Sequence, residues 1–457
     1  MNKFDELRNK YKEFRYKGYT ITEDIDKIAI EYLFEIPYLS VFKPIIEIEK
    51  RNIKFKPINN DFVKKLVFNI GMIELISYWK CACSKKVIIE CGELDNEQIS
   101  WFKKLYYYGL GEYRYVNHID VSCDEMLDIE IELNDEYKLS NDTIDKSLLN
   151  GILIPVGGGK DSCVTLELLS QDINNNLCLI VGGKEPSVRT AEIAGYNDKI
   201  VYVNRVIDKR LIELNKLGYL NGHTPFSSMI AFLSYLIAYL TGKKYVSLSN
   251  ESSANESNVK GENINHQYSK SFEFEEDFRQ YVDKYFNAKV EYFSMLRPLN
   301  ELQIAMLFSR FKKYHKIFRS CNVGSKVVPW KWCGDCPKCL FVYIILSPFL
   351  YKNELIEIFG NDLFEKEGLL KTFIDLCGYG ETKPFECVGT YEEVNFAIAK
   401  TIEKLSVNNI ELPYLLNYYK ENYDLVNTDI DITKRYNREN NLPKEYDDIL
   451  RGWILND

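Results

Sequence analysis

The chain has 457 residues, 46% of them hydrophobic, and this length and composition favour a folded protein of two or three domains over an intrinsically disordered one. A formal net charge of −9 argues against general electrostatic capture of nucleic acid or of an anionic membrane, so an anionic substrate must be bound by a local pocket. Twelve cysteines in a large chain, whose first residues MNKFDELRNKYKEF lack the apolar core of a signal peptide, favour reduced thiols or metal ligands over disulfides.

Residues 1–147 form the first of three predicted domains. Short mixed segments such as KKLVFNIGMIELISYWK and KKVIIECGEL indicate an α+β region that is rich in aromatic residues. The sequence of this region contains no phosphate-binding loop, so it assigns no chemistry to this domain.

Residues 148–345 form the second predicted domain, in which strand-like apolar runs alternate with helical ones. The strand-like runs are ILIPV, LCLIVGG, KIVYVNR and KYVSLS, and the helical runs are DSCVTLELLSQ, SVRTAEIAG and the stretch 226–240. This alternation predicts an α/β fold whose parallel sheet is covered by helices on both faces. Ligands of such sheets bind beyond the carboxyl ends of the strands.

The stretch 226–240, FSSMIAFLSYLIAYL, is the longest apolar run of the chain. It is shorter than the roughly 20 residues that a bilayer requires, and it contains hydroxyl groups. We therefore expect a buried helix in a soluble, cytoplasmic protein that makes no contact with a membrane.

The loop IPVGGGKDS at 154–162 follows a predicted strand and precedes a predicted helix. Gly157, Gly158 and Gly159 allow backbone N–H groups and the positive end of the helix to converge on a phosphate. The Walker A motif does not fit, because Ile154 and Asp161 stand where it needs a glycine and a hydroxyl residue, and the dinucleotide fingerprint fails because Ser162 replaces its third glycine. A simple glycine turn would leave Lys160, Asp161 and Ser162 unexplained.

The sequence GGGKDS resembles the SGGKDS signature of the ATP pyrophosphatase, or PP-loop, superfamily, with Gly157 in place of the usual serine. The resemblance implies cleavage of ATP between its α and β phosphates. It implies that Gly158, Gly159 and Ser162 hold the pyrophosphate, that Lys160 neutralises it and that Asp161 positions Mg²⁺. The role of Gly157 in this cradle stays open, because it lacks the hydroxyl donor.

Three further residues are candidates for the same ATP site. Lys184 follows the second strand and a pair of glycines, and it could approach the nucleotide. Glu251, in SNESSANESN at 249–258, could be a second Mg²⁺ ligand, although this segment could equally be a solvated turn. Arg297, in LRPL, has the planar fork that suits a phosphate or a carboxylate.

Four cysteines have the spacing of a metal site. Cys321 precedes the compact motif CGDCPKC, which contains Cys333, Cys336 and Cys339. Two successive C-x₂-C steps and one distant cysteine suit a tetrahedral zinc ion, and four sulfur ligands leave no open position. We therefore expect a structural zinc site, against the alternative of four unrelated thiols.

Residues 346–457 form the third predicted domain, which is mostly helical and contains the loop PFECVG at 384–389. Stretches spread over the whole chain resemble the UDP-N-acetylmuramoyl-L-alanyl-L-glutamate epimerase family, and the combination includes N-terminal and C-terminal motifs that the 7-cyano-7-deazaguanine synthases do not share. The stretches are IGMIELISYWK, WFKKLYYYGLGEY, SNESSANESN, HQYSKSFEFE, LRPLNELQIAMLFS, WCGDCPKCLFV and KPFECVGTYEEVN.

The resemblance implies an ATP-dependent inversion of the terminal L-glutamate of a peptidoglycan precursor, with release of AMP and pyrophosphate. The α-carbon of a free carboxylate is a very poor acid, whereas an acyl adenylate gives an enolate that oxyanion donors can stabilise. The partner is then a small peptidyl nucleotide-sugar. The alternative function is amidation of a small aromatic acid by a synthase of the deazaguanine kind, and a third class is a non-catalytic, zinc-stabilised interaction protein.

Inversion needs one or two bases, and the sequence offers three candidates. Cys387, in the Pro- and Gly-bounded loop PFECVG, is the preferred thiol, although a small buried hydrophobe is an equally good interpretation. His266 is the second candidate and His223 is its alternative; either could be a structural histidine.

Overall fold

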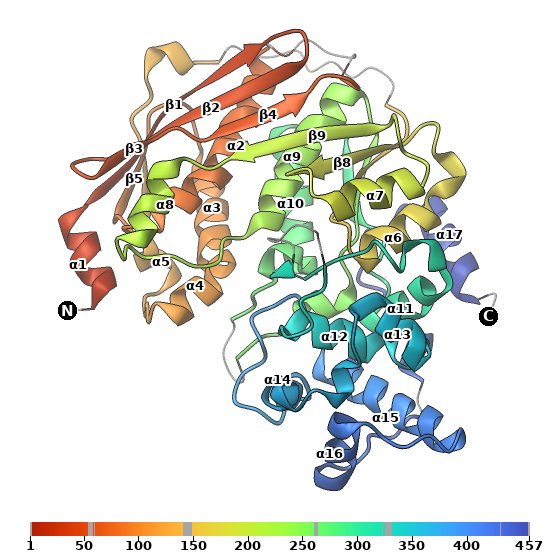
Figure 1. Ribbon diagram of the computed structural model, residues 1–457. Helices are drawn as coiled ribbons and strands as arrows, with labels where there is room; N and C mark the ends of the chain where they lie inside the picture. Colours follow the sequence, from red (N-terminus) through yellow and green to blue (C-terminus); the bar gives the residue numbers. More distant parts are fainter. Residues whose placement is uncertain are drawn as a thin grey trace.

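The computed structural model describes residues 2–53, 58, 60–139, 149–259, 264–321, 323–324, 331–429 and 431–455. Its strands form one sheet in the order β11-β10-β7-β8-β9-β4-β2-β1-β5-β6, with β3 paired to β2 (Figure 1). The molecule is thus a mixed α/β protein built on a single large sheet, and its helices pack on that sheet and extend beyond it at the C-terminal end of the chain.

One half of the sheet is entirely parallel, as the alternating pattern predicts. The four strands predicted from the sequence are all present, and a fifth, β11, was not predicted. These strands are β7 (Ile152–Pro155), β8 (Leu177–Val181), β9 (Ile200–Val206), β10 (Tyr245–Leu248) and β11 (Glu291–Ser294).

The other half of the sheet comes from the N-terminal region. There β1, β2 and β4 form an antiparallel meander, while β5 and β6 run parallel to β1. The strands are β1 (Glu13–Glu23), β2 (Lys27–Ile36), β3 (Ser40–Phe42), β4 (Ile45–Glu49), β5 (Lys86–Ile89) and β6 (Asp128–Ile131). Strand β4 pairs antiparallel with β9, so hydrogen bonding continues across the first two predicted domains. The boundary proposed between residues 147 and 148 lies outside the described residues, and the three-domain division stays a prediction.

Helices cover both faces of the parallel half. Along β7, Leu153 faces one apolar core, while Ile152 and Ile154 face the other, as the two-residue period of a strand requires. The first core contains α2 (Asp61–Trp79), α3 (Asn96–Gly109), α9 (Phe226–Thr241) and α10 (Phe272–Tyr285). The second contains α6 (Lys160–Leu168), α7 (Glu185–Ile193), α11 (Glu301–Arg310) and α12 (Pro337–Leu346).

The long apolar run of the sequence is α9, a buried helix, as predicted. It ends at Gly242, whose φ of 68° is a left-handed conformation that glycine adopts without strain. Within the described part of the chain, none of the helices combines the length and the apolar character needed to cross a bilayer.

The region after α12 is helical, as expected; α13, α14 and α15 pack on α12, α15 also packs on α11, and α17 packs on α6 (Figure 1). Its helices are α13 (Lys352–Phe359), α14 (Leu370–Leu376), α15 (Tyr391–Val407), α16 (Tyr414–Asn422) and α17 (Lys444–Leu455). The remaining helices are α1 (Lys3–Lys10), α4 (Gly111–Val116), α5 (Cys123–Met126) and α8 (Lys209–Lys216).

Candidate active site

The glycine loop lies between β7 and α6 and is shaped for close approach of an anion. Gly158 has a φ of 80°, and a Cβ atom there would stand 2.6 Å from the backbone nitrogen of Ser187, so only glycine fits. Gly159 is the N-cap of α6, and none of the described side chains caps this helix. The Gly157 N–H donates to Oγ of Ser162 at 3.0 Å. The first turn of α6 therefore keeps backbone donors for a phosphate.

Four loops meet at the carboxyl edge of the parallel strands. Because β8, β7, β10 and β11 are neighbours in the sheet, the segments that follow them share this edge. Lys184 follows β8 as the N-cap of α7 and is exposed. Glu251 follows β10 and is buried, and Arg297 and Glu301 follow β11. The predicted ATP-binding and Mg²⁺-binding residues thus lie on one side of the sheet.

A buried cluster of charges lies directly behind the glycine loop. Lys160 is 2% exposed, and its ammonium pairs with both Asp161 and Glu301. Burial opposes the charge of Lys160, but the surrounding carboxylates raise its pKa. Burial likewise opposes the charge of Asp161, yet Lys160 and two further lysines lower its pKa.

Two more carboxyl groups belong to this cluster. Burial raises the pKa of Glu301 to about 7 although Lys160 acts against it. The pKa of Glu251 is also raised, by burial and by the nearby charge of Asp161. Asp161 and Glu251 are therefore close enough to repel one another, which is the arrangement that a divalent cation relieves.

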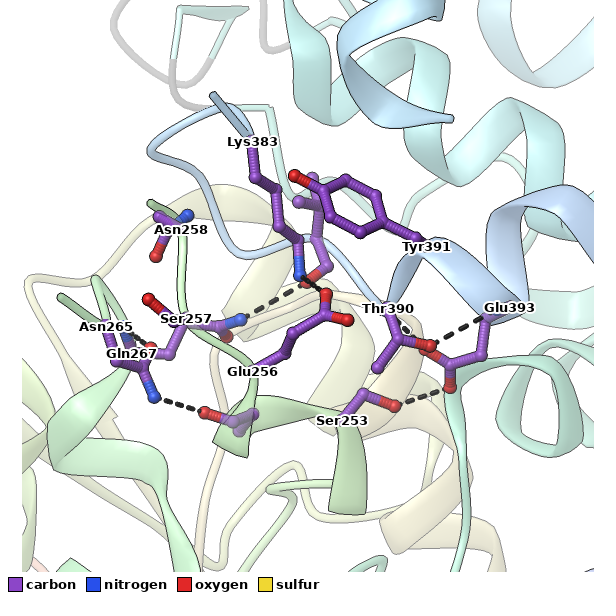
Figure 2. Close-up of polar contacts among 12 residues, drawn as sticks. Ser253, Glu256, Ser257, Asn258, Asn265, Gln267, Lys383, Thr390, Tyr391 and Glu393 are labelled. Carbon is purple, nitrogen blue, oxygen red and sulfur yellow. Dashed lines mark hydrogen bonds and ion pairs between the residues drawn. The ribbon is translucent and has the colours of Figure 1, made fainter. Parts of the chain in front are cut away.

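Glu393, in the first turn of α15, connects the third predicted domain to this cluster. Its carboxylate accepts from the backbone N–H of Glu301 at 2.7 Å, from Oγ of Ser253 at 2.5 Å and from Oγ1 of Thr390 at 2.8 Å. Figure 2 shows Ser253 and Thr390 converging on Glu393 from two different segments. Glu301 and the segment after β10 are thus held by one buried carboxylate.

Arg297 contacts protein groups on all sides. It is fully buried, and its guanidinium contacts the carboxylate of Glu275 at 3.1 Å and the backbone oxygens of Glu251 and Lys270 at 2.6 and 2.7 Å. The planar fork does pair with a carboxylate, but with one of the protein itself. Arg297 therefore fixes the backbone of two site residues, and its contact with ATP stays a prediction.

Cys387 lies beside this charge cluster. Its sulfur accepts a hydrogen bond from Nζ of Lys270 at 3.1 Å, and its backbone oxygen accepts one from Lys338. Burial alone would raise the pKa of the Cys387 thiol, but Lys270 and His266 outweigh it and lower that pKa to about 5. A thiolate is therefore the dominant form of Cys387 near neutral pH.

Polar contacts hold the loop of Cys387 against the segment after β10. Asn258 donates to the backbone oxygen of Pro384 at 2.9 Å, and Gln267 donates to that of Val388 at 3.3 Å. Lys383, which is 2% exposed, pairs with Glu256 (Figure 2). These contacts fix both ends of the short loop that carries the thiolate.

His266 and His223 share one carboxylate, that of Glu112 on α4. Nδ1 of His266 lies 2.5 Å from Oε2 of Glu112, and Nδ1 of His223 lies 3.8 Å from the same atom. Burial would lower the pKa of His266, but hydrogen bonds to Cys387 and Glu112 raise it to about 9. Burial and the charge of His266 lower the pKa of His223 to about 3. Near neutral pH, His266 is thus an imidazolium and His223 a neutral imidazole.

The four predicted zinc ligands form a separate cluster at the start of α12. Three sulfur–sulfur distances are 3.5 Å for Cys336 and Cys339, 3.6 Å for Cys333 and Cys339, and 3.8 Å for Cys321 and Cys336. A tetrahedral zinc ion with bonds of about 2.3 Å separates its sulfurs by about 3.8 Å. The spacing fits a zinc ion and is far too long for a disulfide bond.

The structure brings most of the predicted site residues together, and it adds others. One site contains the glycine loop, Lys160, Asp161, Glu251, Cys387 and His266. Lys184 lies on the exposed edge of this site, Arg297 is buried behind it, and the four cysteines lie beside it. Sequence reasoning missed Lys270, Lys338, Glu301 and Glu112. Each of these residues lies inside a quoted stretch, HQYSKSFEFE, WCGDCPKCLFV, LRPLNELQIAMLFS or WFKKLYYYGLGEY, and a charged residue in such a stretch was the available signal.

Comparison with known proteins gives one consistent family. The model of the MurL N-terminal domain matches residues 5–295, and the model of the MurL C-terminal domain matches residues 317–416. Three relatives carry the name UDP-N-acetyl-alpha-D-muramoyl-L-alanyl-L-glutamate epimerase. The relative from Xanthomonas oryzae pv. oryzae (strain MAFF 311018) is 33% identical over 348 residues, which are 75% of this chain and 75% of the relative.

The other two relatives are about equally similar to this chain. The relative from Micromonospora sp. (strain ATCC 39149 / NRRL 15099 / SCC 1413) is 33% identical over 72% of this chain and 73% of its own. The relative from Salinispora tropica (strain ATCC BAA-916 / DSM 44818 / JCM 13857 / NBRC 105044 / CNB-440) is 34% identical over 72% of this chain and 71% of its own. The two matched domains contain the glycine loop, Cys387 and both histidines of the site, while Arg297 and Glu301 lie between them.

Proposed function

The chain belongs to the UDP-N-acetyl-alpha-D-muramoyl-L-alanyl-L-glutamate epimerase family, and from that premise we propose that it inverts the terminal L-glutamate of UDP-N-acetylmuramoyl-L-alanyl-L-glutamate in peptidoglycan precursor synthesis. The PP-loop assignment is part of the same proposal. So are the acyl adenylate and its products, AMP and pyrophosphate.

ATP is the co-substrate that fits the glycine loop. The close approach at Gly158 and the uncapped start of α6 form a cradle for a pyrophosphate. Lys160 would neutralise this group, and Lys184 on the neighbouring loop would approach the nucleotide. Lys160 is held by Asp161 and Glu301 in the structure, and because an ammonium group has three N–H donors, one donor remains for a phosphate oxygen.

Mg²⁺ fits two carboxyl groups of the cluster around Lys160. Asp161 and Glu251 are oxygen ligands of the kind that Mg²⁺ prefers, and their mutual repulsion favours a cation between them. Bound there, the ion would neutralise phosphate charge during transfer of AMP. The four-cysteine cluster would hold a structural zinc ion, with no open position for chemistry.

Adenylation is the step that makes the inversion feasible. Removal of the α-proton beside a free carboxylate would place a second negative charge on the same group. Transfer of AMP to a carboxylate oxygen, with loss of pyrophosphate, removes the first charge and lets the carbonyl take up the second as an enolate. Water then releases AMP, so hydrolysis of ATP drives the inversion in one direction.

Cys387 is the base in this proposal, and its position carries the proposal. A thiolate whose pKa is about 5 takes a proton near neutral pH, and Lys270, at 3.1 Å from the sulfur, stabilises its charge. Burial opposes the charge of this lysine, but the charges of Cys387, Glu251 and Asp161 raise its pKa. The base and the proposed adenylation residues thus belong to a single electrostatic cluster.

His266 is the acid that returns the proton. Its imidazolium lies close enough to the thiolate for each group to shift the pKa of the other, so the α-carbon of the substrate would enter between the two groups. A proton lost to Cys387 on one face and gained from His266 on the other inverts the centre. The pair is then reset by proton exchange with water.

The experiment combines the chain, ATP, Mg²⁺ and UDP-N-acetylmuramoyl-L-alanyl-L-glutamate in D₂O. The proposal predicts substrate-dependent AMP and pyrophosphate together with D-glutamate that carries deuterium at its α-carbon. Absence of both AMP and inversion would contradict the proposal. A parallel reaction with 7-carboxy-7-deazaguanine and ammonia tests the amidation alternative, and we expect it to release no AMP.

A further inference from the structure

Glu112 comes from the N-terminal region, to which the sequence assigns no chemistry. It lies in the first turn of α4, and its carboxylate contacts Nδ1 of His266 at 2.5 Å. The backbone of α4 itself lies against the same segment, because a Cβ atom at Gly111 would meet Ile264 and Asn265 at 3.5 to 3.8 Å. Glu112 is thus delivered to His266 by the packing of the helix that carries it.

Glu112, His266 and Cys387 form a row of interacting charged groups. His266 contacts Glu112 through Nδ1, and it lies close enough to the thiol group of Cys387 for each of the two groups to shift the pKa of the other. Asn258 links the segments of His266 and Cys387. Its Oδ1 accepts a hydrogen bond from the backbone N–H of His266 at 2.8 Å, and its amide donates one to the backbone oxygen of Pro384, in the loop of Cys387. The carboxylate, the imidazole and the sulfur are therefore held in a fixed order.

The charged groups around Glu112, His266 and Cys387 come from five segments of the polypeptide. Lys270, Lys338 and His266 face the sulfur of Cys387. His223 and His266 face the carboxylate of Glu112. The charge of this carboxylate also acts to raise the pKa of Lys80, at the end of α2. Glu112 is the carboxylate that contacts Nδ1 of His266. Without it, His266 would carry its charge beside Lys270 and Lys338 with the thiolate as its remaining counter-ion.

We propose that Glu112 is a positioning residue that orients the ring of His266 and keeps it charged, so that Cys387 is held as a thiolate. This role rests on the proposed function only for its effect on catalysis, because the charge state of Cys387 can be measured without a substrate. A carboxylate that accepts from Nδ1 fixes the ring orientation and favours the charged ring. The N-terminal region then supplies part of the proton-transfer machinery.

The direction of the effect follows from the order of charges. With Glu112 present, the proton that His266 and Cys387 share lies on His266, which is positively charged, and Cys387 is a negatively charged thiolate. Loss of the carboxylate lowers the proton affinity of His266, and the proton then moves toward the sulfur. The thiolate persists only at higher pH, and the imidazolium only at lower pH, so the pH range in which both exist becomes narrower.

The first test is a titration of the thiolate in the full-length chain, followed by its ultraviolet absorbance and corrected with Cys387→Ser. The parent chain should titrate with a midpoint well below that of an ordinary thiol. Glu112→Gln should raise this midpoint by about one pH unit, a tenfold change in the ratio of thiolate to thiol. Glu97→Gln, which removes an exposed glutamate that pairs with Lys284 on the surface, should leave the midpoint unchanged.

The second test measures inversion. Glu112→Gln should lower kcat by about 10- to 100-fold with little change in KM, and it should move the alkaline limb of the pH–rate profile to lower pH. Glu112→Asp, which keeps the charge on a shorter side chain, should recover part of the loss. Circular dichroism of each variant establishes that it is folded.

Three results would overturn the proposal. One is a parent chain in which Cys387 titrates as an ordinary thiol, which needs no variant to fold. Another is a folded Glu112→Gln chain with an unchanged thiolate midpoint. The third is a zinc content of two per chain, because the ligand atoms of Glu112, His223 and His266 lie within 4.8 Å of one another, a spacing that a metal ion could also use. A low thiolate midpoint, as expected, in a chain that does not invert the substrate would instead contradict the proposed function alone.

Discussion

Gly158 is the residue of the proposed ATP site at which a side chain is least tolerated. Its positive φ and the 2.6 Å approach of a Cβ atom to the backbone of Ser187 are two separate obstacles to any other residue. Gly218, which follows α8, has a similar φ of 83°, but a Cβ atom there would meet nothing within 4 Å. The two glycines therefore separate the cost of the backbone conformation from the cost of the close contact.

Gly158→Ala should abolish substrate-dependent AMP release and destabilise the fold by more than Gly218→Ala does. Gly218→Ala should cost about 1–2 kcal/mol, the strain of a left-handed alanine, and should keep its AMP release. Thermal unfolding and an AMP assay of both variants give the comparison. Equal loss of activity in both would contradict the role of the close contact.

Cys387 owes its thiolate to the cations around it, and this gives a pH dependence with a defined sign. The pKa of its thiol is lowered to about 5, so the thiolate, which is the proposed base, is present above that pH and is lost as the pH falls through it. Lys270→Met removes the cation that lowers the pKa of Cys387 most, so this pKa should rise. At a fixed pH below the acidic limb of the pH–rate profile, the rate of deuterium incorporation should then fall about tenfold for each pH unit by which this limb moves upward.

The control for this variant is Lys284→Met, which removes an exposed lysine from α10. It should leave the pH–rate profile unchanged. An acidic limb that stays in place in folded Lys270→Met would show that Lys270 does not stabilise the base.

At the scale of elements, the sequence predicts those parts of the site that are contiguous in the chain. GGGKDS and CGDCPKC each carry their own spacing, so the turn before α6 and the sulfur cluster before α12 could be predicted. The strands β7 to β10 and the helices α6, α7 and α9 could be predicted from their apolar periods.

The residues that the sequence did not reveal act through distant partners. Lys270 meets Cys387, which is 117 residues away, and Glu112 meets His266, which is 154 residues away. Arg297 carries a guanidinium group that suits a phosphate, yet in the structure this group pairs with Glu275. A local sequence motif could not reveal this pair, because the motif does not show which carboxylate the fold brings near. Pairing of β4 with β9 was missed for the same reason.

The four-cysteine cluster and the site share α12. Cys336 is the N-cap of this helix, Cys339 lies in its first turn, and Lys338 between them donates to the backbone of Cys387. A zinc ion at the cluster would therefore fix the position of a lysine that faces the thiolate.

Cys333→Ser should remove the bound zinc, lower the unfolding temperature and reduce inversion. Elemental analysis should find one zinc per parent chain and well under one per variant chain. Cys123→Ser, at a half-buried thiol outside the cluster, should keep both the metal and the activity. A fully active, zinc-free chain would contradict a structural role for the ion.

On the scale of the whole molecule, one sheet joins the N-terminal region to the parallel half. Ile46 and Ile48 of β4 lie opposite Arg205 and Val203 of β9. Arg205 also donates to the buried carboxylate of Glu74 on α2 at 2.7 Å. An ion pair therefore links α2 of the N-terminal region to β9 of the parallel half.

Arg205→Met leaves Glu74 buried without its cation and should destabilise the chain by about 3–5 kcal/mol. Arg189→Met, which breaks an exposed pair with Glu192, should change the stability by less than about 0.5 kcal/mol. Denaturant unfolding should lose the whole chain in one transition. Two separate transitions, with only one moved by Arg205→Met, would show that the two halves fold independently.

The central claim is that one site both adenylates the substrate and inverts it, with Lys160 serving the first step and Cys387 the second. The most direct measurement is exchange of labelled pyrophosphate into ATP by Cys387→Ala, together with deuterium incorporation at the α-carbon. We expect substrate-dependent exchange to continue while deuterium incorporation falls by about 100-fold or more. Deuterium incorporation at the parent rate, or loss of both reactions in a folded variant, would contradict this claim.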